Sequence, residues 1–65
     1  MPLNPRQQLF VDEYLKDANG TQAVIRAGYS TNGAKVTAHR LLTNPNVQAA
    51  VKAGQARIAK AADVS

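Results

Sequence analysis

The dipeptide Asn-Pro occurs twice in the chain, at residues 4–5 and 44–45, and each copy precedes a segment compatible with a helix. Asparagine is a favourable N-cap, and proline suits the first helical position because its missing N–H would be unpaired there. The two copies therefore predict helices over about residues 5–17 and 45–61. In the first helix, Gln7 completes an approximate capping box with the preceding asparagine. Five apolar residues fall on one face, and Leu9 falls off it: Phe10, Val11, Tyr14, Leu15 and Ala18 share the face.

The dipeptide Asn-Gly also occurs twice, at residues 19–20 and 32–33, but no alternating strand pattern flanks either copy. A hairpin is therefore not predicted, because this signal needs alternating strands on both sides. Asn19 instead indicates the end of the first helix and the N-cap of a short second helix over residues 20–27. A helix of two turns does not persist alone, so its neighbours must hold it in place.

A tight turn is expected after this short helix. Gly28 can adopt positive φ at a helix C-terminus, and Tyr29 can fill the angle between two helices. Ser30 can cap a third helix over about residues 31–42. Four helices with short connections and no strand predict an all-α domain over residues 1–65 that contains a helix-turn-helix. Small residues facing inward would let its second and third helices approach closely: Ala23, Ala27, Ala34 and Ala38.

The charged residues are distributed unevenly along a chain whose net charge is +4. Before the tail, the carboxylates all lie in the first predicted helix, at Asp12, Glu13 and Asp17. A basic run without carboxylates suits a polyanionic partner, and the alternative is an ordinary solubilising surface. The charged residues from Ala18 to Ala62 are all basic: Arg26, Lys35, Arg40, Lys52, Arg57 and Lys60.

Composition argues against several classes of function. The absence of cysteine excludes disulfides, thiolate zinc sites and cysteine nucleophiles, and His39 alone cannot form a metal site. The sequence contains no nucleophile–base pair and no phosphate-binding loop, so we expect neither an enzyme nor a cofactor. No apolar run approaches the roughly 18 residues that cross a bilayer, and the first residues lack the pattern of a signal peptide. We therefore expect a soluble intracellular protein.

The outer face of the predicted third helix carries the candidate DNA-binding residues. An α-helix fits the major groove of B-DNA, where each base pair presents a distinct pattern of donors and acceptors. Gly33 and His39 also have simpler interpretations, as a tolerated weak point in the helix and as a polar surface residue. The candidates for contact with base edges are Asn32, Lys35, Val36 and His39. The candidates for contact with phosphates are Arg26 on the predicted second helix and Thr31, Gly33 and Arg40 on the third.

Strings of residues along nearly the whole chain resemble the terminase small subunit family of tailed phages and prophages. The resemblance is carried by residues 4–7, 10–11, 13–14, 19–23, 25–30, 40–42, 44–45 and 47. The Arg-Ala-Gly-Tyr-Ser string, joined to the Leu-Leu and Asn-Pro pairs, is the most specific part. The resemblance implies a DNA-binding domain that recognises viral double-stranded DNA in the host cytoplasm at the start of genome packaging. Gly20 departs from the family pattern, which commonly has alanine there.

The resemblance also implies partners for the whole protein. A ring-shaped oligomer would deliver DNA to a large subunit that carries the ATPase and nuclease activities. Family members usually continue with helices for oligomerisation and large-subunit contact. These regions are expected outside this chain, and the chain alone is expected to be monomeric.

Two other functions remain as alternatives. A transcriptional regulator could use the same helix-turn-helix as a dimer on a palindrome. A helical interaction module could instead dock a protein partner on an apolar stripe of the last helix, although such a stripe more often closes the core. The residues of this stripe are Val47, Val51, Gly54 and Ile58.

Overall fold

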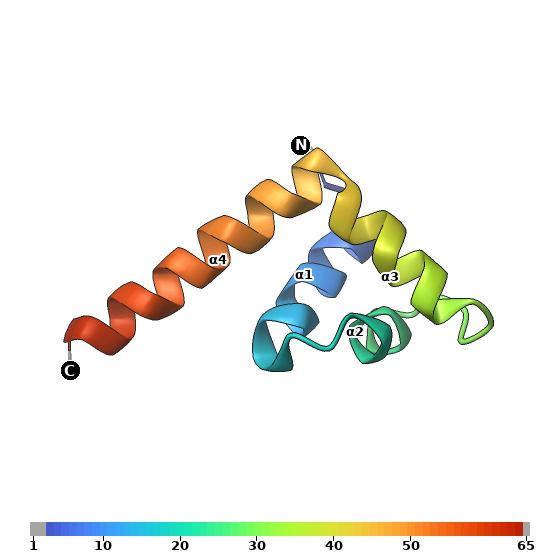
Figure 1. Cartoon of the computed structure of the whole chain (residues 1–65), viewed down its shortest axis with the longest axis horizontal. Helices are drawn as coiled ribbons and strands as arrows, with labels where there is room; N and C mark the ends of the chain where they lie inside the picture. The colour runs from blue at the N-terminus through green and yellow to red at the C-terminus, as the bar shows by residue number, and fades with distance from the viewer. Residues whose placement is uncertain (1–2, 65) are drawn as a thin grey trace.

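The structure is a computed structural model that describes the backbone of residues 3–64 and the side chains of residues 3–59. This part of the chain is built of helices and contains no strand, which confirms the predicted all-α class. The first three helices gather into a small body, and the C-terminal part of the last helix extends away from it (Figure 1). The helices are α1 (Pro5–Asp17), α2 (Gly20–Arg26), α3 (Ala34–Thr43) and α4 (Pro45–Val64).

Helix α1 begins with the predicted capping box. The Asn4 side chain accepts a hydrogen bond from the Gln7 backbone N–H at 2.8 Å, and the Gln7 side chain accepts one from the Asn4 backbone N–H at 3.1 Å. At the other end, Ala18 adopts a left-handed conformation with φ of 55° and is exposed. The prediction that Ala18 lies on the buried face was therefore wrong, because this reversal takes it out of the helical register.

Helix α2 ends in a Schellman motif. The backbone N–H of Tyr29 donates to the carbonyl of Val24, and that of Gly28 donates to the carbonyl of Ile25, both at 3.1 Å. Gly28 has φ of +92°, which confirms the conformation predicted for it. The helix is one residue shorter than predicted, because Ala27 is its C-cap.

Helix α3 begins at Ala34, three residues later than predicted. Its N-cap is Gly33, which has φ of +72° and provides no side-chain cap. A positive φ cannot belong to a right-handed helix, so Thr31 and Asn32 lie in the preceding turn. The Ser30 hydroxyl accepts from the Asn32 backbone N–H at 3.1 Å instead of capping α3. The predicted cap at Ser30 was therefore wrong.

The core lies where the four helices meet. Phe10 and Val11 of α1 pack with Val24 of α2 and Val47 of α4, and all four side chains are fully buried. The small residues predicted to face inward from α2 and α3 are at most 5% exposed, which confirms their placement: Ala23, Ala27, Ala34 and Ala38.

The apolar stripe of α4 closes the core over most of its length. Val47, Val51 and Gly54 are buried, whereas Ile58 is 53% exposed because α4 has by then left the body (Figure 1). Helix α4 continues to Val64, beyond its predicted end. Among residues 3–64, no helix is long and apolar enough to cross a membrane.

Candidate nucleic-acid interface

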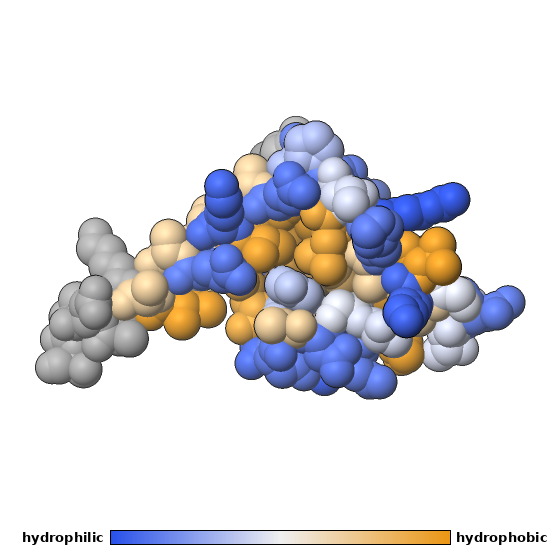
Figure 2. Space-filling view, viewed as in Figure 1, coloured by the Kyte–Doolittle hydropathy of each residue, from blue (hydrophilic) through white to orange (hydrophobic). Residues whose placement is uncertain are grey.

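The outer face of α3 is open to solvent. Lys35, Val36, His39 and Arg40 are all exposed. Helical spacing places Val36 and Arg40 opposite the buried Ala38, with His39 beside them and Lys35 at the margin of this face. Thr43 lies on the same face and is also exposed, although the sequence did not single it out. Figure 2 shows hydrophilic side chains projecting from the edge formed by α3, with a small hydrophobic patch among them. The four predicted α3 residues therefore share one accessible surface.

The close packing of α2 against α3 leaves this surface standing clear. A β carbon on Gly20 would lie 3.2 Å from the β carbon of Ala38 and 3.4 Å from Cδ1 of Leu42. The two helices are thus separated by little more than backbone at this point. Because the inner side of α3 is occupied by α2, only its outer side is available to a partner.

The turn between α2 and α3 is fixed from a second direction by α1. The guanidinium of Arg6 lies over the ring of Tyr29, 5.5 Å from its centroid, in a cation–π arrangement. Burial raises the pKa of the Tyr29 hydroxyl further above its ordinary value of 10.0. The predicted turn residues Gly28, Tyr29 and Ser30 accordingly form a connection that the rest of the body holds in place.

Three of the predicted site residues lie just before α3 instead of on it. Thr31, Asn32 and Gly33 are exposed in the turn that leads into the helix. Apart from Gly33 itself and the residues on either side of it, no heavy atom would lie within 4 Å of a β carbon added to Gly33. These residues border the first turn of α3, and Lys35 and Val36 follow them directly.

Arg26 has a different environment from the basic residues of α3. Its Nη2 lies 2.8 Å from Oδ2 of Asp17, and its Nη1 lies 3.5 Å from Oε1 of Glu13. Lys16 also pairs with Glu13, at 2.8 Å. The carboxylates of α1 thus offset the charge of Arg26 and tie α2 to α1.

The cationic partners of Glu13 and Asp17 lower the pKa values of these two carboxyl groups. The hydrogen bond from Lys16 is the largest effect that lowers the pKa of Glu13. The hydrogen bond from Arg26 is the largest effect that lowers the pKa of Asp17, and the backbone N–H of Asn19 adds a second hydrogen bond. Both groups are therefore firmly ionised at neutral pH.

Lys35 and Arg40, by contrast, form no ion pair with any carboxylate of residues 3–59. The chain has no carboxylate at all between Asp17 and Asp63. The outer face of α3 therefore presents positive charge that no neighbouring side chain neutralises, as a surface for a polyanion requires.

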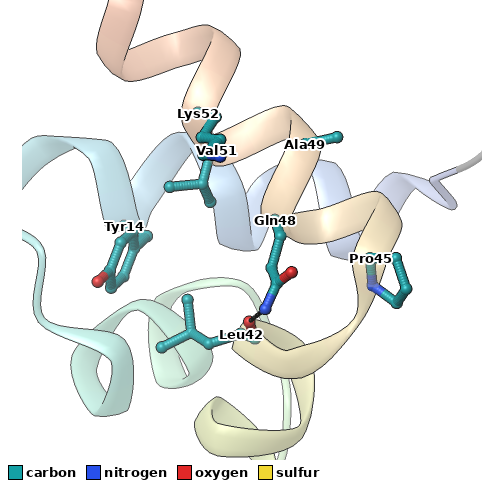
Figure 3. Close-up of a pocket in the computed structure, with 7 residues that line it drawn as sticks. All are labelled: Tyr14, Leu42, Pro45, Gln48, Ala49, Val51 and Lys52. Carbon is teal, nitrogen blue, oxygen red and sulfur yellow. Dashed lines mark hydrogen bonds between the residues drawn. The ribbon is translucent and has the colours of Figure 1, made fainter.

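A shallow groove lies on another part of the molecule, between α1, the end of α3 and the start of α4. Tyr14, Leu42 and Val51 point into it, and the Gln48 side chain donates to the Leu42 carbonyl at 2.9 Å at its edge (Figure 3). The polar residues among those that line it are Tyr14, Gln48 and Lys52. No three metal-ligating side chains come together in the described part of the chain.

Comparison with known proteins places this geometry in context. A family model described as terminase small subunit matches residues 3–65. The PBSX phage terminase small subunit of Bacillus subtilis (strain 168) is 50% identical over 50 residues, which cover 77% of this chain and 19% of the relative. The terminase small subunit of Staphylococcus phage 80alpha is 45% identical over 51 residues, which cover 77% of this chain and 35% of the relative.

A further relative, the terminase small subunit of Bacillus phage SF6, is 40% identical over 52 residues, which cover 78% of this chain and 36% of the relative. The aligned part of this chain thus corresponds to 19–36% of the length of these curated relatives. No solved structure matches the chain.

Proposed function

The chain belongs to the terminase small subunit family, and from that premise we propose that it is the domain that binds viral double-stranded DNA when genome packaging begins. In this proposal it acts by recognition and is not an enzyme. Family membership favours packaging over the transcriptional regulator and the interaction module considered from the sequence.

The observation that carries the proposal is the exposed, unneutralised basic face of α3. Lys35 and Arg40 project from it without a carboxylate partner in the described part of the chain. Basic side chains release condensed counterions when they contact phosphates, and this release supplies much of the affinity of a protein for DNA.

The helix-turn-helix arrangement gives this face a defined way to approach a duplex. The second helix of such a motif enters the major groove, with the residues of its N-terminal part nearest to the base edges. Lys35, Val36 and His39 would then face bases, together with Asn32 from the turn. Arg40 lies further along α3 and would meet a phosphate.

The turn before α3 and the last residue of α2 complete the proposed contacts. Thr31 and Gly33 are exposed at the start of α3, where backbone approaches a phosphate without obstruction. Arg26 would reach a phosphate only if its pairing with Asp17 were exchanged for the new contact. We therefore assign Arg26 a weaker contribution than Lys35 or Arg40.

The partners of the whole protein follow from the family. We propose that the complete protein acts in the host cell as an assembly of several copies that passes DNA to a terminase large subunit. Linking several modest DNA-binding domains raises apparent affinity by roughly 10² to 10⁴ without new contacts. None of the described residues is assigned to the assembly or to the large subunit.

Fluorescence anisotropy with a labelled duplex over a series of salt concentrations tests the proposal. Lys35→Ala and Arg40→Ala are expected to weaken binding and to reduce the slope of log affinity against log salt by about 0.9 for each lost phosphate contact. Lys16→Ala removes an equal charge from α1 and serves as the matched control, with a smaller expected effect. Equal losses in all three variants would contradict the assignment of the α3 face.

A further inference from the structure

We propose that Val36 makes this surface selective for A·T base pairs by packing against the C5-methyl group of thymine. The inference rests on the proposed function, because it names the base that the α3 face recognises. Val36 is 60% exposed, more than the two other exposed large hydrophobic residues among residues 3–59, Leu9 at 50% and Ile58 at 53%. It is also the only exposed large hydrophobic residue of α2, α3 and the turn between them.

The position of Val36 within α3 suits contact with a base rather than with the DNA backbone. It is the third residue of the helix, and the N-terminal residues of a recognition helix contact base edges. The turn before it ends at Gly33, where open space around the backbone allows close approach to the duplex. Arg40 lies one helical turn further on, where a phosphate contact is expected.

The chemistry of a valine side chain leaves one feature of the major groove for it to recognise. Valine has no donor or acceptor, so it cannot pair with the hydrogen-bonding groups of any base. The thymine methyl is the apolar group that unmodified DNA presents in this groove. Burial of a group of this size corresponds to a factor of about four in affinity.

The neighbours of Val36 favour DNA over a protein as the occupant of this patch. Lys35 is adjacent and Arg40 lies four residues on, and neither forms an ion pair with residues 3–59. The core of a protein interface is poor in lysine because burial removes its hydration. A single apolar residue between two unneutralised cations instead matches a methyl group bordered by phosphates.

Binding of the 65-residue chain to two alternating duplexes of equal length, d(A-T) and d(A-U), tests the inference at low ionic strength. Both duplexes carry the same charge, and deoxyuridine differs from thymidine only by the missing methyl group. The wild-type chain is expected to bind d(A-T) about threefold to fivefold more tightly. Val36→Ala should bind both duplexes equally, and Thr43→Ala, the matched control on the same face, should keep the wild-type ratio.

A second pair of duplexes separates the methyl group from the base that carries it. The 5-methylcytosine form of d(G-C) places a methyl group at the same position in the groove. The wild-type chain should therefore bind this form more tightly than the unmodified form, whereas Val36→Ala should bind the two forms with equal affinity. Circular dichroism of Val36→Ala should match that of the wild-type chain, because this side chain is exposed.

The outcomes distinguish the inference from the function on which it rests. Binding of d(A-T) and d(A-U) with equal affinity would overturn the role of Val36 and leave DNA binding intact. A d(A-T) preference that persists in Val36→Ala would also overturn it, because the methyl would then be recognised elsewhere. Failure to bind any of the duplexes would overturn the proposed function as well.

Discussion

A methyl group of Leu15 occupies the position that a β carbon on Gly54 would take. The Cδ2 atom of the same leucine would lie 3.1 Å from that carbon. Helix α4 therefore crosses α1 at a point where only a glycine fits above the leucine. This crossing holds the first half of α4 on the body, and the helix extends away beyond it (Figure 1).

Gly54→Ala is expected to destabilise the domain, although alanine favours a helix over glycine by about 1 kcal/mol. Displacement of Leu15 outweighs that gain, because overpacking of a well-packed contact costs about 1–3 kcal/mol. Thermal unfolding followed by circular dichroism measures the change. In a Leu15→Ala background, Gly54→Ala should instead stabilise the domain by up to about 1 kcal/mol. A loss of stability in both backgrounds would contradict the close contact between Gly54 of α4 and Leu15 of α1.

Ala18→Gly is expected to stabilise the domain by about 0.5–1 kcal/mol. Ala18 has φ of 55°, a conformation that costs an L-residue free energy and that glycine adopts freely. Urea unfolding measures the gain. Ala49→Gly makes the same replacement at an exposed position inside α4, where a loss of about 1 kcal/mol is expected. Changes of the same sign in the two variants would be inconsistent with the left-handed conformation of Ala18.

The helix caps should differ in their contributions to stability. The Asn19 side chain accepts from the Gln22 backbone N–H at 3.1 Å and caps α2, so Asn19→Ala is expected to cost about 1 kcal/mol. Ser30 caps no helix, because α3 begins after Gly33. Ser30→Ala should therefore cost less than half as much in the same unfolding measurement. Equal losses would indicate that α3 begins near Thr31 after all.

Stability is expected to fall in acid through Glu13 and Asp17. Their cationic partners lower both pKa values below the ordinary values of 4.5 and 3.8. The unfolded chain then binds more protons than the folded chain as the pH falls, so folding is disfavoured progressively. The contribution of the two ionised carboxylates to the free energy of unfolding should be complete above the ordinary pKa values. It should be lost as the pH falls through the lowered pKa values, and unfolding midpoints measured over a pH series check this.

Two substitutions assign this pH dependence to its sources. Arg26→Gln should raise the pKa mainly of Asp17, and Lys16→Gln should raise it mainly for Glu13, because these are the largest effects on each carboxyl. Carboxyl carbon chemical shifts followed by NMR report both values. An unchanged pKa of Asp17 in Arg26→Gln would show that the interhelical pair does not form.

Much of the fold could be predicted because its signals are local. The capping box of Asn4 and the positive φ of Gly28 after α2 are signalled by residues close together in the sequence, and both occur as predicted. The start of α3 could not be predicted in the same way. Ser30 is an acceptable N-cap in the sequence, and the backbone conformation of Gly33 decides the boundary.

The candidate site was predicted to a similar extent. The period of a helix was enough to place Val36 and Arg40 on one exposed face with Lys35 at its margin. The pairing of Arg26 with Asp17 could not be foreseen, because it spans nine residues and depends on the angle between α1 and α2. The sequence therefore identifies the basic residues, and the structure distinguishes those that already form ion pairs with carboxylates.

The central claim is that the outer face of α3 binds the duplex. Addition of a DNA duplex to the ¹⁵N-labelled chain, followed by two-dimensional NMR, tests it most directly. The amide resonances of Lys35, Val36, His39 and Arg40 are expected to shift most, while those around Glu13 stay in place. Binding that shifts the α1 or α4 resonances and leaves α3 unchanged would contradict the account.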